Sequence, residues 1–220
     1  MTAFPTEGDI SSSFRPQLAL ASSNPGKIAE FRAILGEDID LVSLIDLGLS
    51  SPEETGSTFE ANAELKARYV FEHCGLVTLA DDSGLEVDAL EGRPGVMSAR
   101  YAGDGHEDAA NRALLLRTLG SLPDGKRTAR FVAVIAVIDG QGELTLSRGT
   151  CEGRITFEER GSGGFGYDSL LELADGRTLA EVDSASKNVV SHRANAMRRA
   201  LPTVRAALDL PQLEEGRLTR

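Results

Sequence analysis

The sequence predicts an α/β fold with a mixed β-sheet, and two patterns indicate it. Short apolar segments alternate with segments of helical periodicity along most of the chain, as in β-α-β units with parallel strands. The turn Asp139-Gly140-Gln141-Gly142 then joins two further strand-like segments, and strands joined by a hairpin pair antiparallel. A sheet with both kinds of connection has parallel and antiparallel neighbours.

In the first half of the chain, short apolar runs predict three strands, at residues 18–22, 41–44 and 76–80. Apolar residues three and four positions apart predict a helix over residues 27–35, between the first two strands. A second helix is predicted over residues 57–73. The spacing of Ser57 and Glu60 predicts a capping box at its start.

The second half of the chain predicts a long buried strand, because residues 131–138 are apolar on both faces. The hairpin turn after it leads into a predicted strand at 143–148, and a further strand is predicted at 153–158. Helices are predicted over residues 108–119 and 191–208, with a kink at Pro202 in the second.

The two ends of the chain lack periodicity. We expect residues 1–16 to be a disordered extension and residues 211–220 to be a loose polar tail. No apolar run approaches the ~20 residues that a membrane span needs, and no basic and apolar leader opens the chain. We therefore expect a cytoplasmic protein with no membrane partner.

The charge balance excludes one class of partner. The chain has 23 Lys and Arg against 34 Asp and Glu, a net charge of −11, whereas a broad nucleic-acid-binding surface needs a basic face. A small phosphate ligand remains compatible, because a few local cations and a carboxylate-bound divalent metal can hold it. We expect no nucleic-acid partner.

A phosphate-binding loop is predicted where the first strand meets the first helix, in Ser22-Ser23-Asn24-Pro25-Gly26-Lys27. Backbone N–H groups at a helix N-terminus favour an anion. Asn24 adds an amide donor and Lys27 adds a positive charge. The P-loop pattern is absent, and an ordinary turn that needs Asn and Gly for its backbone explains the same residues.

Carboxylates and a lysine follow in the next two segments. After Glu53-Glu54-Thr55-Gly56, the second predicted helix carries Asn62 and Lys66 four residues apart, so they share one face. The third strand ends in a predicted turn, Asp81-Asp82-Ser83-Gly84, and strand ends are the usual ligand sites of open α/β sheets. Because side chains alternate along a strand, the two aspartates should point in different directions. A solvated helix face and turn-forming aspartates are the alternative interpretations.

Two later segments have the chemistry to bind a nucleobase. The segment Gly161-Ser162-Gly163-Gly164-Phe165-Gly166-Tyr167-Asp168 offers aromatic faces and a carboxylate, although a flexible loop with buried aromatics has the same composition. Ser191 is a predicted N-cap. Lys187, His192 and Arg193 then gather at a helix start, against the helix dipole, which indicates an anion or an electron-rich base edge nearby.

Together these segments resemble the XTP/dITP pyrophosphatase family, which includes the inosine triphosphatases. The matching pieces occur in the family's order, across roughly residues 18–208. They are residues 23–27, 53–56, 59–67, 80–85, 92–101, 163–168 and 191–193. The chain departs mildly in its first loop, which opens with Ser22-Ser23 where the family often has Thr-Gly.

The resemblance implies an elongated mixed β-sheet flanked by helices, with two lobes and a central cleft, and a single catalytic domain over residues 17–210. It implies a homodimer that uses Mg²⁺ to hydrolyse XTP, ITP and dITP to the monophosphate and pyrophosphate. Asp82 would be the catalytic carboxylate, Glu53 and Asp82 would hold the metal, and Arg100 is a weaker candidate for the site. The implied substrate-binding residues are Ser22, Ser23, Asn24, Pro25, Gly26, Lys27, Lys66, Ser83, Phe165, Gly166, Tyr167, Asp168, Lys187, His192 and Arg193.

Two other functions remain open at this point. A Maf-type nucleotide pyrophosphatase shares the logic of the first loop, although the segments 163–168 and 191–193 argue against it. A nucleotide-binding module without turnover is the second alternative. Glu53 and Asp82 argue against that module, because a pure anion-binding site avoids negative charge beside phosphate.

Overall fold

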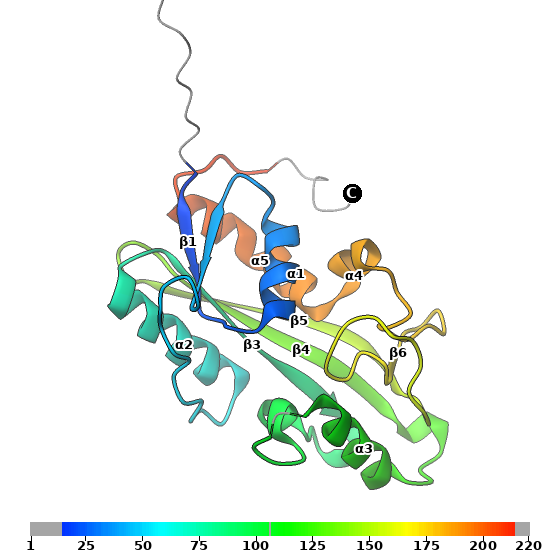
Figure 1. Ribbon diagram of the computed structural model, residues 1–220. Coiled ribbons are helices and arrows are strands. Elements are labelled where there is room, and N and C mark those ends of the chain that lie inside the picture. The colour runs from blue at the N-terminus through cyan, green and yellow to red at the C-terminus, as the bar shows by residue number, and fades with distance from the viewer. Residues whose placement is uncertain (1–14, 106, 214–220) are drawn as a thin grey trace, which may run out of the picture.

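A computed structural model of the chain describes residues 15–105 and 107–213, which form a six-stranded mixed sheet flanked by helices (Figure 1). The strands are β1 Gln17–Leu20, β2 Asp40–Ser43, β3 Thr78–Val87, β4 Thr128–Ile138, β5 Leu144–Ile155 and β6 Leu171–Glu172, in the order β2-β1-β3-β4-β5-β6. β1 pairs in parallel with β2 and β3, whereas the pairs from β3 to β6 are antiparallel. The predicted fold class is confirmed. Most of the predicted extension and of the predicted tail lies outside the described residues.

Helices connect most of these strands. The α-helices are α1 Pro25–Leu35, α2 Phe59–Cys74, α3 Asp108–Leu119, α4 Ser184–Val190 and α5 His192–Ala207, and the short 3-10 helices are η1 Asp88–Leu90, η2 Gly95–Arg100 and η3 Asp124–Lys126. The predicted N-cap at Ser191 is confirmed, since its side chain accepts from the N–H of Ala194. The capping box predicted at Ser57 is wrong. The N-cap is Thr58, whose side chain accepts from the N–H of Ala61.

The third strand is twice as long as the sequence predicts. β3 continues through Asp81 and Asp82 to Val87, and it pairs with β4 along its whole length, with Asp82 opposite Val134. The predicted turn at residues 81–84 is therefore wrong. The ladder with β4 overrides the local turn preference of Asp, Ser and Gly. As a result, both aspartates are held on a strand rather than in a loop.

The two strands predicted at 143–148 and 153–158 are one strand, β5. Gly149, which the prediction placed in a break, lies in the middle of this strand. A Cβ there would overlap the backbone of α5 at Ala196. The glycine therefore permits close approach of helix and strand rather than a turn. The sequence patterns did not predict α4, the two-residue strand β6 or the three 3-10 helices η1, η2 and η3.

Helices cover both faces of one half of the sheet. On one face, Phe31 of α1 and Met197 of α5 share a core with Ile135 of β4. On the other face, Phe59 of α2 shares a core with Val134. Alternate residues of β4 thus enter opposite cores, which confirms the prediction of a central strand buried on both faces.

A third core occupies the far half of the long strands, where Leu115 of α3 clusters with Phe131, Tyr167 and Leu170. We call the half with α1, α2 and α5 the first lobe. The half with α3 and residues 157–181 is the second lobe. Figure 1 shows α3 at the opposite end of β3, β4 and β5 from β1 and β2.

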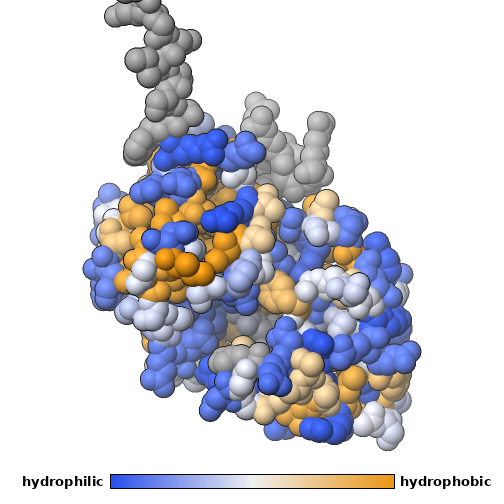
Figure 2. Space-filling view, viewed as in Figure 1, coloured by the Kyte–Doolittle hydropathy of each residue, from blue (hydrophilic) through white to orange (hydrophobic). Residues whose placement is uncertain are grey.

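The surface in Figure 2 is mostly hydrophilic, with apolar residues gathered over the end of the sheet formed by β1 and β2. Within residues 15–105 and 107–213, no helix has the length and apolar character needed to cross a membrane.

Candidate active site

The centre of the site is the pair of aspartates on β3, whose side chains lie on opposite faces of the sheet. Asp81 Oδ2 lies 2.7 Å from Lys27 Nζ of α1 and 3.3 Å from Arg193 Nε of α5. Asp82 Oδ1 lies 2.7 Å from Lys66 Nζ of α2. The contacts confirm the expectation that the two side chains point in different directions, because neighbouring side chains alternate along a strand.

Lys66 joins three parts of the chain. Its Nζ donates to Glu54 Oε1 at 2.8 Å, to the backbone oxygen of Asp81 at 2.9 Å and to Asp82 Oδ1 at 2.7 Å. These acceptors use all the N–H groups of the ammonium, and the side chain is only 5% exposed. A phosphate that binds Lys66 must therefore displace one of these partners.

The pKa values in this cluster reflect burial opposed by charge. Burial alone would lower the pKa of Lys66, but the carboxylates of Asp82 and Glu54 outweigh it and leave the pKa raised. Burial raises the pKa of Asp82, and the charge of Glu54 adds to this, although Lys66 opposes both. Asp82 is thus held as a more basic carboxylate than a solvated aspartate.

Asp81 has the opposite electrostatic character. Its burial would raise its pKa, but Lys27 and Arg193 hold the pKa well below the ordinary value. Lys27 is largely shielded from solvent, with 17% of its side chain exposed, and this burial lowers its pKa despite the partnership with Asp81. Of the neighbouring pair, Asp82 is therefore the better proton acceptor.

The loop before α1 is built as a helix N-terminus. The side chain of Asn24 accepts from the N–H groups of Gly26 and Lys27 at 2.9 and 3.1 Å, and Ser22 Oγ accepts from the N–H of Asn24 at 3.2 Å. A Cβ on Gly26 would lie 2.8 Å from the Phe165 ring. The glycine therefore allows the aromatic segment of the second lobe to pack against this loop.

A second charged cluster lies beside Phe165. Lys187 Nζ contacts Asp168 Oδ2 at 2.8 Å and Glu30 Oε1 at 2.7 Å. Arg193 Nη1 contacts the other oxygen of Glu30 at 2.9 Å. Both cations thus have carboxylate partners from within the protein. Their placement at a helix start indicated an anion or an electron-rich base edge nearby, and carboxylates of the protein itself supply the anions.

His192 stacks on Phe131, with ring centroids 4.7 Å apart and an interplanar angle of 15°. Burial, followed by the charge of Arg193, lowers the pKa of His192 well below its ordinary value, so the ring is neutral at neutral pH. Its Nδ1 is buried and has no hydrogen-bond partner among the described residues. A buried polar atom of this kind is suited to pair with a ligand.

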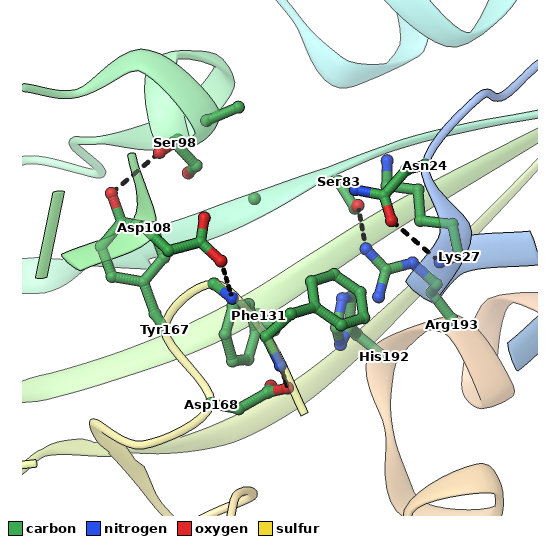
Figure 3. A pocket seen from close by; sticks show the side chains of 14 residues that line it. Asn24, Lys27, Ser83, Ser98, Asp108, Phe131, Tyr167, Asp168, His192 and Arg193 are labelled. Carbon is green, nitrogen blue, oxygen red and sulfur yellow. Dashed lines mark hydrogen bonds between the residues drawn. The ribbon is translucent and has the colours of Figure 1, made fainter. Parts of the chain in front are cut away.

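A cavity lies between the two lobes, and several of the residues described above line it (Figure 3). The cavity brings together Asn24, Lys27, Ser83, Phe165, Gly166, Tyr167, Asp168, His192 and Arg193, all of them predicted site residues. Gly84, Ser98, Ala99, Asp108 and Phe131 also line it. A Cβ on Gly84 would lie 2.5 Å from Gly95 O, so this glycine lets η2 approach the cavity wall.

The remaining predicted residues lie around this cavity rather than on its wall. Ser22 and Ser23 belong to the loop before α1, and Pro25 and Gly26 are the first two residues of that helix. Lys187 lies behind Phe165, with its Nζ 4.9 Å from the ring centroid. Lys66 and Asp82 lie on the α2 face of β3. β1 pairs with β3 only as far as Leu79, so among the described residues no strand pairs with that edge of β3 at the aspartates.

Glu53, the predicted partner of Asp82 on the metal, is exposed, and among the described contacts it has no salt bridge. The neighbouring Glu54 instead shares Lys66 with Asp82. The described residues contain no group of three or more His, Cys, Asp or Glu side chains placed to hold a metal. Mg²⁺ commonly binds one or two carboxylates together with substrate phosphates. The oxygen ligands of Glu54 and Asp82 therefore fit a magnesium ion that arrives with a nucleotide.

Sequence reasoning missed Glu30, Glu54 and Asp108. Glu30 lies three residues after Lys27 on α1, so helical spacing was a usable signal for it. Glu54 and Glu53 are adjacent in an irregular loop, and no periodicity separates their roles. Asp108 enters the cavity only because α3 packs beside residues 165–168, which is a tertiary contact.

Comparison with known proteins points to one family. The model of the Ham1 family matches residues 18–203. The chain is 47% identical over 186 residues to the dITP/XTP pyrophosphatase of Exiguobacterium sibiricum, covering 83% of this chain and 94% of that protein. It is 47% identical over 196 residues to the dITP/XTP pyrophosphatase of Mycobacterium tuberculosis, covering 86% and 96%.

Solved structures agree with the sequence relatives. The Ham1 protein of Staphylococcus aureus superposes with a TM-score of 0.77 at 37% identity, covering 86% of this chain and 98% of that one. A HAM1 protein from Coxiella burnetii gives a TM-score of 0.77 at 40% identity, with the same coverage.

Proposed function

Because the chain belongs to the Ham1 family, we propose that it hydrolyses the non-standard purine nucleoside triphosphates XTP, ITP and dITP to the monophosphate and pyrophosphate. The observation that carries this proposal is the cluster of Asp81, Asp82, Lys27 and Lys66 at the uncovered edge of β3. Relatives that cover most of the chain are named dITP/XTP pyrophosphatases. The proposed catalytic unit is a single domain over residues 17–210.

In this proposal Asp82 is the catalytic carboxylate. Its raised pKa makes it a better base for an attacking water than a solvated aspartate, and Lys66 holds its orientation through Oδ1. The attack is on the α-phosphorus, and pyrophosphate leaves. Lys27 and the backbone N–H groups at the start of α1 offset negative charge on the phosphates.

Mg²⁺ is the proposed cofactor, and Glu53 and Asp82 are its proposed protein ligands. Glu54 is an additional oxygen ligand beside Asp82. When bound, the metal neutralises phosphate oxygens and activates the phosphorus as a Lewis acid. Displacing Glu54 from Lys66 would free a donor of that lysine for the substrate.

The base is proposed to enter the cavity between the lobes, beside Phe165, Tyr167 and His192. A purine with oxygen at position 6 accepts hydrogen bonds there, whereas the amino group of adenine donates. A pocket whose groups donate hydrogen bonds to the base leaves its N–H groups unpaired when adenine binds. This lowers the rate with adenine nucleotides, by roughly 10⁴ in favourable cases. The unpaired, buried Nδ1 of His192 is one group whose partner this proposal supplies.

The test is product analysis with XTP, ITP, dITP, ATP, GTP and pyrimidine triphosphates, with and without Mg²⁺. We expect pyrophosphate from the first three and only in Mg²⁺. Asp82→Asn should lower kcat by about 10²–10⁴-fold, whereas Asp175→Asn, at an exposed aspartate far from the cluster, should not. Preference for pyrimidines would support the Maf-type alternative. Tight ITP binding without pyrophosphate would support the non-catalytic module.

The resemblance also leads us to propose a cytoplasmic homodimer. Sedimentation velocity tests the assembly, and a monomer at micromolar concentration would contradict it.

A further inference from the structure

The aromatic segment of the cavity is held in place by two side chains of α3. Asp108 Oδ2 accepts from the N–H of Gly166 at 2.7 Å, and Arg112 Nη1 donates to the oxygen of Gly166 at 3.0 Å. Asp108 and Arg112 are four residues apart and share one face of the helix. Two side chains of one helix face thus bond both polar groups of a single residue. Figure 3 shows Asp108 directed at this segment.

Gly166 lies between the aromatic residues Phe165 and Tyr167. Its φ is +61°, in the left-handed region that favours glycine. The Phe165 ring packs on Gly26 of the first lobe, and Tyr167 donates from its hydroxyl to the oxygen of Ser98 at 2.9 Å. Because the two aromatic side chains leave the backbone on either side of Gly166, the orientation of this residue determines where both rings lie.

The contacts of Asp108 and Arg112 do not involve the residues proposed to bind the phosphates. Arg112 is oriented by a second bond, from Nε to Glu159 Oε2 at 2.8 Å. Among the described hydrogen bonds, Asp108 and Arg112 have none to Lys27, Lys66 or the aspartates of β3. Loss of either side chain should therefore weaken binding of the base and leave binding of the phosphates unchanged.

We propose that Asp108 and Arg112 are positioning residues that fix Phe165 and Tyr167 for a purine base, and so set affinity for the base-bearing part of the nucleotide. This inference rests on the proposed function, since it takes the ligand to be a purine nucleotide. It assigns to α3, a helix of the second lobe, control over ligand binding in the cleft.

Binding titrations with two ligands in Mg²⁺ separate the ends of the site: inosine monophosphate, which carries the base, and inorganic tripolyphosphate, which does not. Asp108→Ala and Arg112→Ala should each weaken inosine monophosphate by about tenfold, as expected for loss of a hydrogen bond to a charged group. Tripolyphosphate affinity should change by less than about twofold. With ITP as substrate, KM should rise while kcat stays within about threefold.

Asp108→Asn is the conservative variant, because its amide oxygen still accepts from Gly166. It should restore most of the affinity for inosine monophosphate. Amide hydrogen exchange at Gly166 should speed up in Asp108→Ala and return towards the wild-type rate in Asp108→Asn. The matched control is Arg117→Ala, at an exposed position of α3 without a bond to residues 161–169.

Unchanged binding of inosine monophosphate in both alanine variants would overturn the inference. Equal weakening of both ligands would also overturn it, because that result describes general damage to the fold. If wild-type protein binds neither ligand and releases no pyrophosphate, the proposed function itself fails. The two failures are thus distinguishable on wild-type protein.

Discussion

Lys66 is a buried cation whose value to the fold depends on its two carboxylate partners. Removing it leaves Asp82 without its ion-pair partner, and leaves Glu54 with only the longer contact to Arg100, at 3.7 Å. Breaking a buried ion pair from one side typically costs about 3–5 kcal/mol. We therefore expect Lys66→Met to lower the free energy of unfolding by about this amount, as well as to abolish turnover.

The matched control is Arg68→Met on the same helix, where the Arg68 side chain is 47% exposed and pairs with Glu64. An exposed pair contributes about 0–1 kcal/mol. Urea unfolding of both variants tests the difference. Equal stabilities would mean that Lys66 is not desolvated, contrary to its three hydrogen bonds.

His192 makes stability depend on pH. Its pKa is lowered in the folded state by burial and by Arg193, whereas the unfolded imidazole takes up a proton as the pH falls below about 6.5. The unfolded state then binds more protons. Stability contributed by neutral His192 is therefore complete above the unfolded pKa, and it is lost by about 1.4 kcal/mol per pH unit below it, until the folded pKa is reached.

Replacing His192 by Gln should remove this component. We expect the free energy of unfolding to fall less steeply between about pH 7 and 5 in His192→Gln than in wild type. Urea unfolding at several pH values measures both slopes. Parallel slopes would show that the buried ring titrates as it does in the unfolded chain.

At the scale of single residues, the sequence predicts the cations and aspartates better than their partners. Lys27, Lys66, Asp81 and Asp82 belong to short motifs, so residue type and order were sufficient. Spacing along α1 places Glu30 near Lys27, but its actual partners, Lys187 of α4 and Arg193 of α5, follow only from tertiary packing.

At the scale of elements, the packing of α5 on β5 depends on a glycine. A Cβ at Gly149 would overlap backbone atoms of Ala196 and lie 2.5 Å from His192 O. Backbone cannot move aside as a flexible side chain can. We expect Gly149→Ala to cost about 1–3 kcal/mol of stability, the usual range for overpacking.

Gly140 supplies the control for this substitution. It lies in the exposed hairpin turn, and a Cβ there would meet nothing within 4 Å. Gly140→Ala should be neutral or stabilise by about 0.4–1 kcal/mol. Chemical denaturation of the two variants compares them directly, and a neutral Gly149→Ala would contradict the close approach of α5 to β5.

The boundaries of β3 and β5 show that pairing between strands can override the local preference of a residue for a turn. Turn-forming residues at 81–84 and a glycine at 149 predicted breaks, yet β3 and β5 are continuous because each pairs along β4. α1, α2, α3 and α5 were recognisable from periodicity. α4 was not, because its seven residues are too short to show a helical repeat.

At the scale of the whole molecule, the α/β class and mixed sheet followed from the order of elements along the chain. The cavity did not, because its walls come from residues 24 to 193 and from both lobes. Only the ordered set of motifs, through its family resemblance, indicated that these segments meet. The sheet explains why they do, since its long strands β3 and β4 contribute to the cores of both lobes.

In the proposed reaction, water attacks the α-phosphorus of a purine triphosphate beside Asp82. This step can be followed by hydrolysing ITP in water that carries a heavy oxygen isotope and analysing both products by mass spectrometry. We expect label in inosine monophosphate and none in pyrophosphate. Label in pyrophosphate, or release of inorganic phosphate in its place, would contradict it.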